Sequence, residues 1–146
     1  FGQLGLPLVV IGDGPERRRL ESNAGPNVQF LGAVPRSQVR DCMRSCRGLI
    51  YPGKEDFGIT PVEAQATGRP VVAFGAGGAL ETVVDGVTGV LFEEQTTEAL
   101  CDAVTRCSAL AFDRDVIRQH ALQFGRDVFC RKMTDFVQEK WEQHRQ

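Results

Sequence analysis

Two carboxylates eight positions apart, Glu55 and Glu63, lie in the segment of the chain best suited to chemistry. Between them, Gly58 allows close approach of the backbone to a ligand. Thr60 suits the N-cap of a helix and Pro61 its first position, so that Glu63 completes a capping box with Thr60. The unpaired N–H groups at such a helix start bind anions. The segment therefore predicts an anion site that fits a diphosphate, flanked by two carboxylates.

Each carboxylate also has a plainer interpretation. In this interpretation, Glu63 only caps its helix and Glu55 is a solvated charge in a loop. Their neighbours Lys54 and Asp56 are predicted to be solvated. The residue types alone leave these alternatives open.

Glycines cluster where strands are expected to end, the edge at which open α/β sheets bind ligands. Gly12 starts a run that resembles the dinucleotide fingerprint, but Arg17 stands where the third glycine belongs, which argues against an NAD site. A phosphate-binding G-x-x-x-x-G-K-[ST] motif is also absent from the sequence. Gly77 and Gly78 predict either a tight strand-to-helix turn or a close approach to phosphate or sugar.

Short apolar runs alternate with helical patterns, which is typical of βαβ units. The predicted strands lack polar and apolar alternation, as expected of strands covered on both faces. They are Leu8 to Gly12, Val28 to Leu31, Gly48 to Tyr51, Pro70 to Phe74 and Gly89 to Phe92. The sequence therefore predicts an α/β fold with a Rossmann-like, doubly wound parallel sheet of about five strands and helices on both faces.

Amphipathic spacing predicts helices over 37–46, 97–107 and 126–143, with a weaker one over 113–123. In the first of them, the apolar stripe is formed by Val39, Cys42, Met43 and Cys46. We found no repeat or linker, so residues 1–146 are interpreted as one domain, with 125–146 as its C-terminal helix.

Composition excludes several classes of function. The chain has 146 residues and a formal net charge of −2, which gives no electrostatic footprint for nucleic acid. Its longest apolar runs are far shorter than a membrane span. An odd number of cysteines without C-x-x-C spacing favours reduced thiols and a cytoplasmic location, with Cys42 and Cys46 packed in the core. His120 and His144 are interpreted as surface residues, and no metal site is predicted.

Motifs spread over residues 8–143 resemble the donor-binding, C-terminal domain of retaining GT-B glycosyltransferases of family 4. They appear in the order found in that family: Ile11-Gly12-Asp13-Gly14-Pro15, Val28-Gln29-Phe30-Leu31-Gly32, Glu55 and Glu63 with Phe57-Gly58 between them, Gly68-Arg69-Pro70-Val71-Val72-Ala73, and Gly77-Gly78 followed by Glu81 and Asp85-Gly86-Val87-Thr88-Gly89.

This resemblance implies roles for individual residues. Glu55 corresponds to a catalytic glutamate beside the donor sugar, and Glu63 to one that accepts hydrogen bonds from the ribose. Val34 corresponds to a position whose backbone meets the nucleobase, whereas neighbouring Arg36 has no assigned role. The other implied donor-binding residues are Phe57 and Gly58 facing the sugar, Ile59 and Thr60 facing the diphosphate, and Gly12, Gly77 and Gly78.

The implied activity is transfer of a sugar from a UDP-sugar or GDP-sugar to a glycan or lipid, as in polysaccharide biosynthesis, without cofactor, metal or protein nucleophile. We expect the acceptor domain, and a Gly-Arg and Lys clamp for the diphosphate, to precede Phe1. The isolated chain is therefore expected to be inactive. The alternative is a noncatalytic doubly wound module, a truncated product that has lost activity, and a weaker one is a nucleotide-sugar epimerase or phosphorylase-type enzyme of the same architecture.

Overall fold

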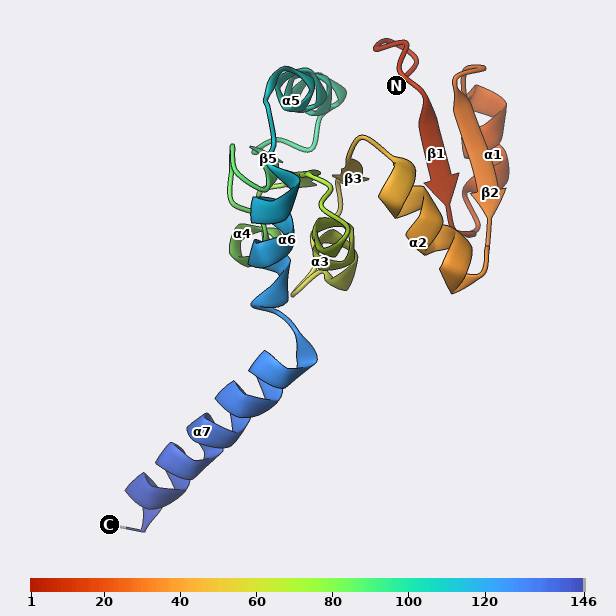
Figure 1. Cartoon of the computed structure of the whole chain (residues 1–146). Coiled ribbons are helices and arrows are strands. Elements are labelled where there is room, and N and C mark those ends of the chain that lie inside the picture. Colours follow the sequence, from red (N-terminus) through yellow and green to blue (C-terminus); the bar gives the residue numbers. More distant parts are fainter. Residues whose placement is uncertain (146) are drawn as a thin grey trace.

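The computed structural model describes residues 1–145, in which strands and helices alternate before three final helices (Figure 1). The elements are β1 (Leu8–Ile11), α1 (Arg17–Asn23), β2 (Val28–Gly32), α2 (Arg36–Ser45), β3 (Leu49–Tyr51), α3 (Ile59–Ala66), β4 (Val71–Phe74), α4 (Ala79–Thr82), β5 (Gly89–Phe92), α5 (Thr97–Ala109), α6 (Arg114–Leu122) and α7 (Arg126–His144). All five predicted strands are present, each within one residue of its expected bounds.

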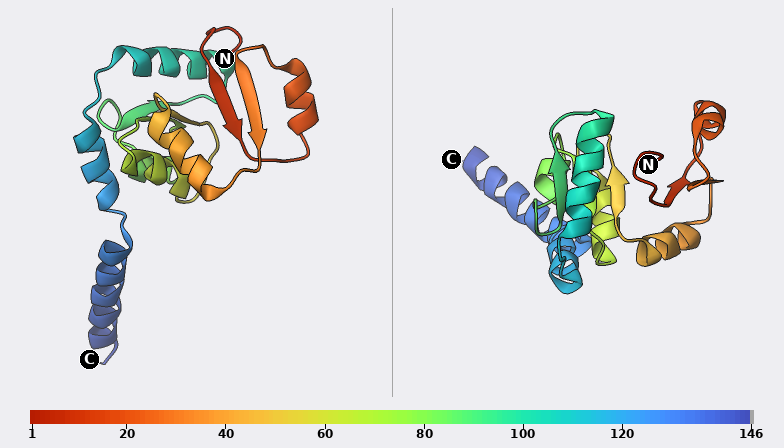
Figure 2. Two further views of the ribbon diagram at one scale, coloured as in Figure 1. Left: turned by 45° about the vertical axis from the view of Figure 1, so that its right-hand side comes forward. Right: turned by 90° about the horizontal axis from the view of Figure 1, so that it is seen from above.

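The strands form two parallel sheets, so the expectation of one continuous sheet is wrong. β1 pairs with β2, and β3, β4 and β5 pair in that order. Figures 1 and 2 show the β1–β2 pair lying apart from the other three strands. In the common doubly wound order 3-2-1-4-5-6, two strands lie on one side of a central strand and three on the other. The two sheets match these flanks, and no strand of residues 1–145 takes the central place.

The core is built around β4 and its neighbours. Val71 and Ala73 face a cluster with Ala64 of α3, whereas Val72 and Val90 face the opposite cluster beneath α5. Both faces of these strands are therefore covered, as predicted. The β1–β2 sheet has less cover, with most of its side chains only half-buried. Side chains of the N-terminal segment pack against the cluster beneath α5, namely Phe1, Leu4 and Leu6.

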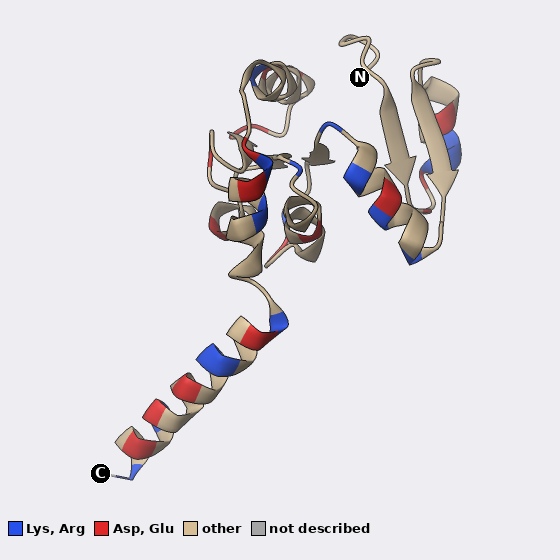
Figure 3. Ribbon diagram, viewed as in Figure 1, with Lys and Arg blue, Asp and Glu red and all other residues tan. Residues whose placement is uncertain are grey.

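The amphipathic helices differ in what they cover. In α2, Met43 is buried and the rest of the predicted stripe is half-buried, and α5 buries Ala103 and Val104. The helix predicted over 126–143 forms as α7, but it extends away from the body and buries none of its residues (Figure 1). Five of its apolar side chains are each at least 45% exposed: Phe129, Met133, Phe136, Val137 and Trp141. Figure 3 shows acidic and basic residues interspersed along it.

The cysteines are free thiols, four of them half-buried. Burial raises the pKa of the Cys46 thiol, although the nearby Arg69 guanidinium works in the opposite direction. Cys42 and Cys46 are half-buried at the packed side of α2 and its C-cap, so neither reaches the fully buried core position that the sequence predicted. In the part of the chain that the structure describes, no helix is both long and apolar enough to span a bilayer.

Candidate functional site

Two loops at the carboxyl ends of β3 and β4 lie side by side. The N–H of Gly78 donates a hydrogen bond of 2.8 Å to the carbonyl oxygen of Glu55, and Glu55 and Gly77 form an isolated parallel bridge. These contacts bring together Glu55, Phe57 and Gly58 from one loop and Gly77 and Gly78 from the other. All five are among the residues to which the resemblance in the sequence analysis gave donor-site roles.

The two glycines are required by this contact. A Cβ atom at Gly78 would overlap the backbone of Phe57, and one at Gly77 would overlap the carbonyl of Glu55. Gly77 also has a φ of 60°, which favours glycine. The sequence analysis offered two interpretations of these glycines, a tight turn or a close approach to a ligand. The structure shows a further reason for them: without side chains, they let one loop pack directly on the other.

The start of α3 corrects the predicted capping box. The helix begins at Ile59, and its N-cap is Gly58, whose φ of 81° lies in the left-handed region and which supplies no side-chain cap. Thr60 is therefore the second helical residue rather than the cap. Pro61 is tolerated at the third position because N–H groups of the first turn have no helical partner. The N–H groups of Ile59 and Thr60 remain available for an anion.

The side chain of Glu63 does not cap α3 but contacts the helix α2. Its Oε1 atom accepts a hydrogen bond of 3.0 Å from Nη2 of Arg36 in an ion pair, and the two side chains are 41% and 91% exposed, respectively. Arg36 is the first residue of α2 and follows Val34 by two positions. The pair thus brings the first turn of α2, which follows Val34, beside the middle of α3. The sequence analysis missed this contact because the two residues lie in different helices and are 27 positions apart in the chain.

Glu55 is exposed and forms no ion pair within residues 1–145. Tyr51, the last residue of β3, lies close to it. Burial raises the pKa of the Tyr51 phenol, and the neighbouring Glu55 carboxylate raises it further. Tyr51 is therefore a site neighbour that the sequence analysis did not single out. Its place at the end of a predicted strand was the available signal.

The side chain of Phe57 turns toward α6. Its ring makes an edge-on contact with Phe124 at 5.8 Å between centroids, and Phe124 contacts the His120 ring at 5.5 Å. His120 is half-buried, with Nε2 at 3.2 Å from the carbonyl oxygen of Thr82, so it is less exposed than the surface position predicted for it. These aromatic contacts anchor the loop, while the backbone of Phe57 stays against Gly78.

Gly12 lies at the end of β1, in the other sheet. Its N–H donates to the carbonyl of Gly32 at 2.9 Å, and its φ of 123° favours glycine. No hydrogen bond links Gly12 to either site loop in the described chain. The structure thus leaves Gly12 in a separate group with Gly32 and Arg17, whose guanidinium pairs with Glu21 at 2.8 Å.

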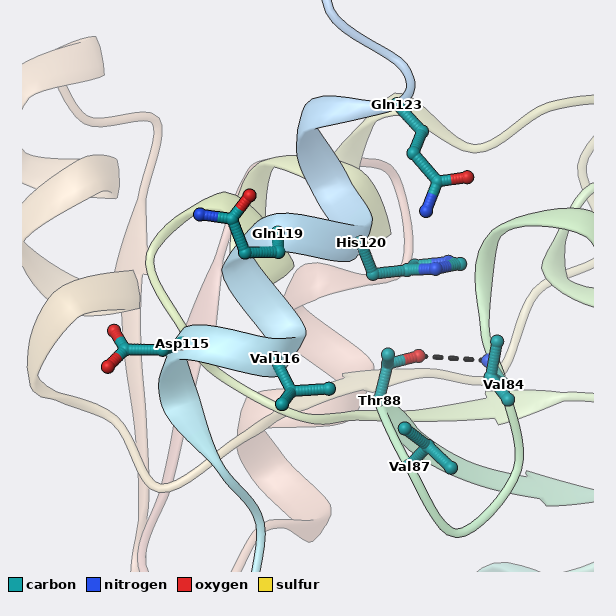
Figure 4. Close-up of a pocket in the computed structure, with 8 residues that line it drawn as sticks. All are labelled: Val84, Val87, Thr88, Asp115, Val116, Gln119, His120 and Gln123. Carbon is teal, nitrogen blue, oxygen red and sulfur yellow. Dashed lines mark hydrogen bonds between the residues drawn. The ribbon is translucent and has the colours of Figure 1, made fainter.

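A hollow of about 410 Å³ lies elsewhere, between α6 and residues 83–88 (Figure 4). The hydroxyl of Thr88 accepts a hydrogen bond of 2.8 Å from the Val84 N–H and so braces the loop. This loop leads into β5 and lies at the amino edge of the sheet, opposite to the site loops. None of the predicted site residues lines the hollow: it is formed by Val84, Val87, Thr88, Asp115, Val116, Gln119, His120 and Gln123.

The described residues contain no cluster of side chains that could bind a metal ion. No three His, Cys, Asp or Glu side chains between positions 1 and 145 are grouped closely enough to share an ion. The chemistry that the site offers comes from its two carboxylates and the N–H groups of α3.

Comparison with known proteins covers most of the chain. The sequence model of the glycosyl transferases group 1 matches residues 3–109. An uncharacterised glycosyltransferase of Methanocaldococcus jannaschii is 27% identical over 139 residues, which are 92% of this chain and 40% of that protein. The alpha-1,3/1,6-mannosyltransferase ALG2 of Dictyostelium discoideum is 49% identical over 65 residues, 44% of this chain and 16% of that protein. The chain thus spans at most 40% of the length of these two relatives.

Solved structures give the same picture of the fold. The sucrose-phosphate synthase of Thermosynechococcus elongatus superposes with a TM-score of 0.74 at 26% identity, over 92% of this chain and 38% of that one. HepE of Anabaena, in complex with UDP and glucose, gives 0.68 at 25% identity, over 91% of this chain and 40% of that one. The predicted α/β architecture, that of GT-B glycosyltransferases, is therefore confirmed for this chain.

Proposed function

Because the chain belongs to the glycosyl transferases of group 1, we propose that it is the donor-binding half of a retaining enzyme. That enzyme transfers a sugar from a nucleotide-diphosphate sugar to a glycan or lipid acceptor. The observation that carries the proposal is the junction of the two site loops at the start of α3. It gathers Glu55, Gly77 and Gly78 next to the free N–H groups of the helix.

Each part of the donor has a partner of suitable chemistry. The diphosphate binds the N–H groups of Ile59 and Thr60, where the partial positive charge of the helix start favours an anion. The ribose hydroxyls donate to Glu63, and the nucleobase lies against the backbone at Val34. The donor sugar lies at Glu55. That HepE is solved with UDP and glucose supports a nucleotide-sugar as the ligand class.

The proposed reaction breaks the bond between the sugar and the diphosphate on the same face on which the acceptor attacks. Negative charge grows on the departing diphosphate and positive charge on the sugar ring, so both ends need stabilisation. The start of α3 stabilises the first, and the carboxylate of Glu55 stabilises the second. The leaving phosphate accepts the acceptor proton, so the step requires no nucleophile or metal from this chain.

The acceptor side of the reaction is assigned to a part of the enzyme outside these residues. Without that wall the donor site is open to water, and we propose that the chain alone has negligible transferase activity. The competing proposal is a noncatalytic doubly wound module. Nucleotide binding separates the two, because only the donor-binding half requires it.

The first prediction concerns Glu63. We expect one of UDP, GDP and ADP to bind the purified chain in calorimetric titration, and Glu63→Gln to weaken that binding about tenfold, the effect of a hydrogen bond to a charged group. Glu142→Gln, which makes the same charge change on α7, is the matched control and is expected to leave the affinity unchanged. Absence of binding by all three nucleotides would favour the noncatalytic module.

The second prediction concerns Glu55. Because it is assigned to the sugar rather than the nucleotide, Glu55→Gln should weaken UDP-glucose binding about fivefold and leave UDP binding unchanged. This comparison requires UDP to be the nucleotide selected above, and otherwise uses the matching sugar nucleotide. Asp56→Asn, an exposed neighbour in the same loop, serves as the control. An equal loss for UDP and UDP-glucose would show that Glu55 does not act on the sugar.

A further inference from the structure

The ion pair between Arg36 and Glu63 contributes little to the stability of the fold. Both side chains are substantially exposed, and exposed pairs contribute only about 0 to 1 kcal/mol. Arg36 also stands in the first turn of α2, where the helix dipole disfavours a positive charge. Neither the helix nor the core therefore accounts for an arginine at this position.

The place of the pair between the elements is more informative. α2 connects the β1–β2 sheet to the β3–β5 sheet, and its final turn is held to the α3 side by two hydrogen bonds. Thr67 donates to the carbonyl of Met43 at 3.3 Å, and Arg69 donates to the carbonyl of Arg44. At its first turn, the hydrogen bond that joins α2 to α3 within residues 1–145 is the one from Arg36 to Glu63.

We propose that Arg36 is a positioning residue for nucleotide binding: it fixes the Glu63 carboxylate and holds the Val34 segment next to it. The proposal rests on the proposed function, in which Glu63 receives the ribose and Val34 the base. The guanidinium occupies Oε1 of Glu63, which leaves Oε2 and the remaining lone pair to accept ribose hydroxyls. Nucleotide thus meets a carboxylate that is already oriented.

A carboxylate on a freely rotating side chain loses rotamer entropy when it binds, and orientation beforehand reduces that cost. Arg36→Ala should therefore weaken binding of the nucleotide diphosphate about threefold in calorimetric titration. Arg36→Lys should recover part of the loss, since it keeps the charge but not the planar fork. The control is Arg40→Ala, which removes the same charge one turn further along α2 at a side chain without an ion pair in the described chain.

A double-mutant cycle with Glu63→Gln tests whether Arg36 acts through Glu63. With Glu63→Gln already present, Arg36→Ala should change the affinity by less than about 1.5-fold. The 2′,3′-dideoxy form of the same nucleotide offers Glu63 no ribose hydroxyl, so the loss of affinity in Arg36→Ala should shrink to the part that comes from the base at the Val34 segment.

Three results would overturn the inference: unchanged or tighter binding by Arg36→Ala, an equal loss in Arg40→Ala, or an undiminished loss with the dideoxy nucleotide. In each of these the wild-type chain still binds nucleotide, so the proposed function stands. Failure of the wild-type chain to bind UDP, GDP and ADP would instead overturn both the proposed function and the role of Arg36.

Discussion

Gly78→Ala is expected to abolish detectable nucleotide binding and to lower the free energy of unfolding by about 2 kcal/mol. Gly78 is buried, and its φ of −62° and ψ of −19° are ordinary for any residue, so alanine introduces no backbone strain. The effect is steric, since the new Cβ would overlap backbone atoms of Phe57, which cannot turn aside as a flexible side chain would. Overpacking of this kind costs about 1 to 3 kcal/mol.

Relief of the overlap requires the two site loops to separate. Separation breaks the bond from the Gly78 N–H to the Glu55 carbonyl and moves Glu55 away from the start of α3. Chemical denaturation and calorimetric titration of the same preparation measure both effects. Gly53→Ala is the control, because a Cβ there meets nothing within 4 Å. Native-like binding by Gly78→Ala would mean that the loop junction is not part of the site.

The strands were predictable because their sequences are short and mostly apolar. Runs such as Val71 to Phe74 are apolar throughout, and glycines punctuate their ends. Which strands pair is a different matter, because periodicity reports burial and carries no information about neighbours. The sequence therefore did not show that β1 and β3 belong to different sheets. It also did not show that the apolar face of α7 is exposed, because the apolar residues of α7 have the same spacing as those of a packed helix.

The site shows the same boundary between local and long-range information. Loops 52–58 and 75–78 both follow the carboxyl ends of predicted parallel strands, so the sequence could place both at one edge of the sheet. That the two loops touch depends on the pairing of β3 with β4, which the sequence did not show. The pair formed by Arg36 and Glu63 depends on how two helices lie side by side, which short-range patterns do not encode. The capping box was wrong for another reason: Thr60 fits an N-cap, but the left-handed Gly58 starts the helix two residues earlier.

Ile117→Ala is the second large expected effect, with a loss of about 3 kcal/mol in the free energy of unfolding. Ile117 is 0% exposed and lies in the middle of α6, which packs against α3. Truncation of a buried isoleucine removes apolar burial and leaves a cavity, at a cost of about 2 to 5 kcal/mol. Because Phe124, whose ring anchors Phe57, follows the last residue of α6 by two positions, the site loop depends on this packing.

Val116→Ala is the matched control. The side chain of Val116, next to Ile117, is 45% exposed, so its truncation should lower the free energy of unfolding by well under 1 kcal/mol. Amide hydrogen exchange then locates the damage. Protection in β4 and β5 should fall about 100-fold in Ile117→Ala, as 3 kcal/mol implies for amides that exchange through global opening. A smaller fall in β1 and β2 would show that the two sheets, which share no hydrogen-bonded strand pair, unfold separately. A loss similar to that of Val116→Ala would mean that α6 does not hold α3 in place, and that the site loop is fixed by its glycine junction alone.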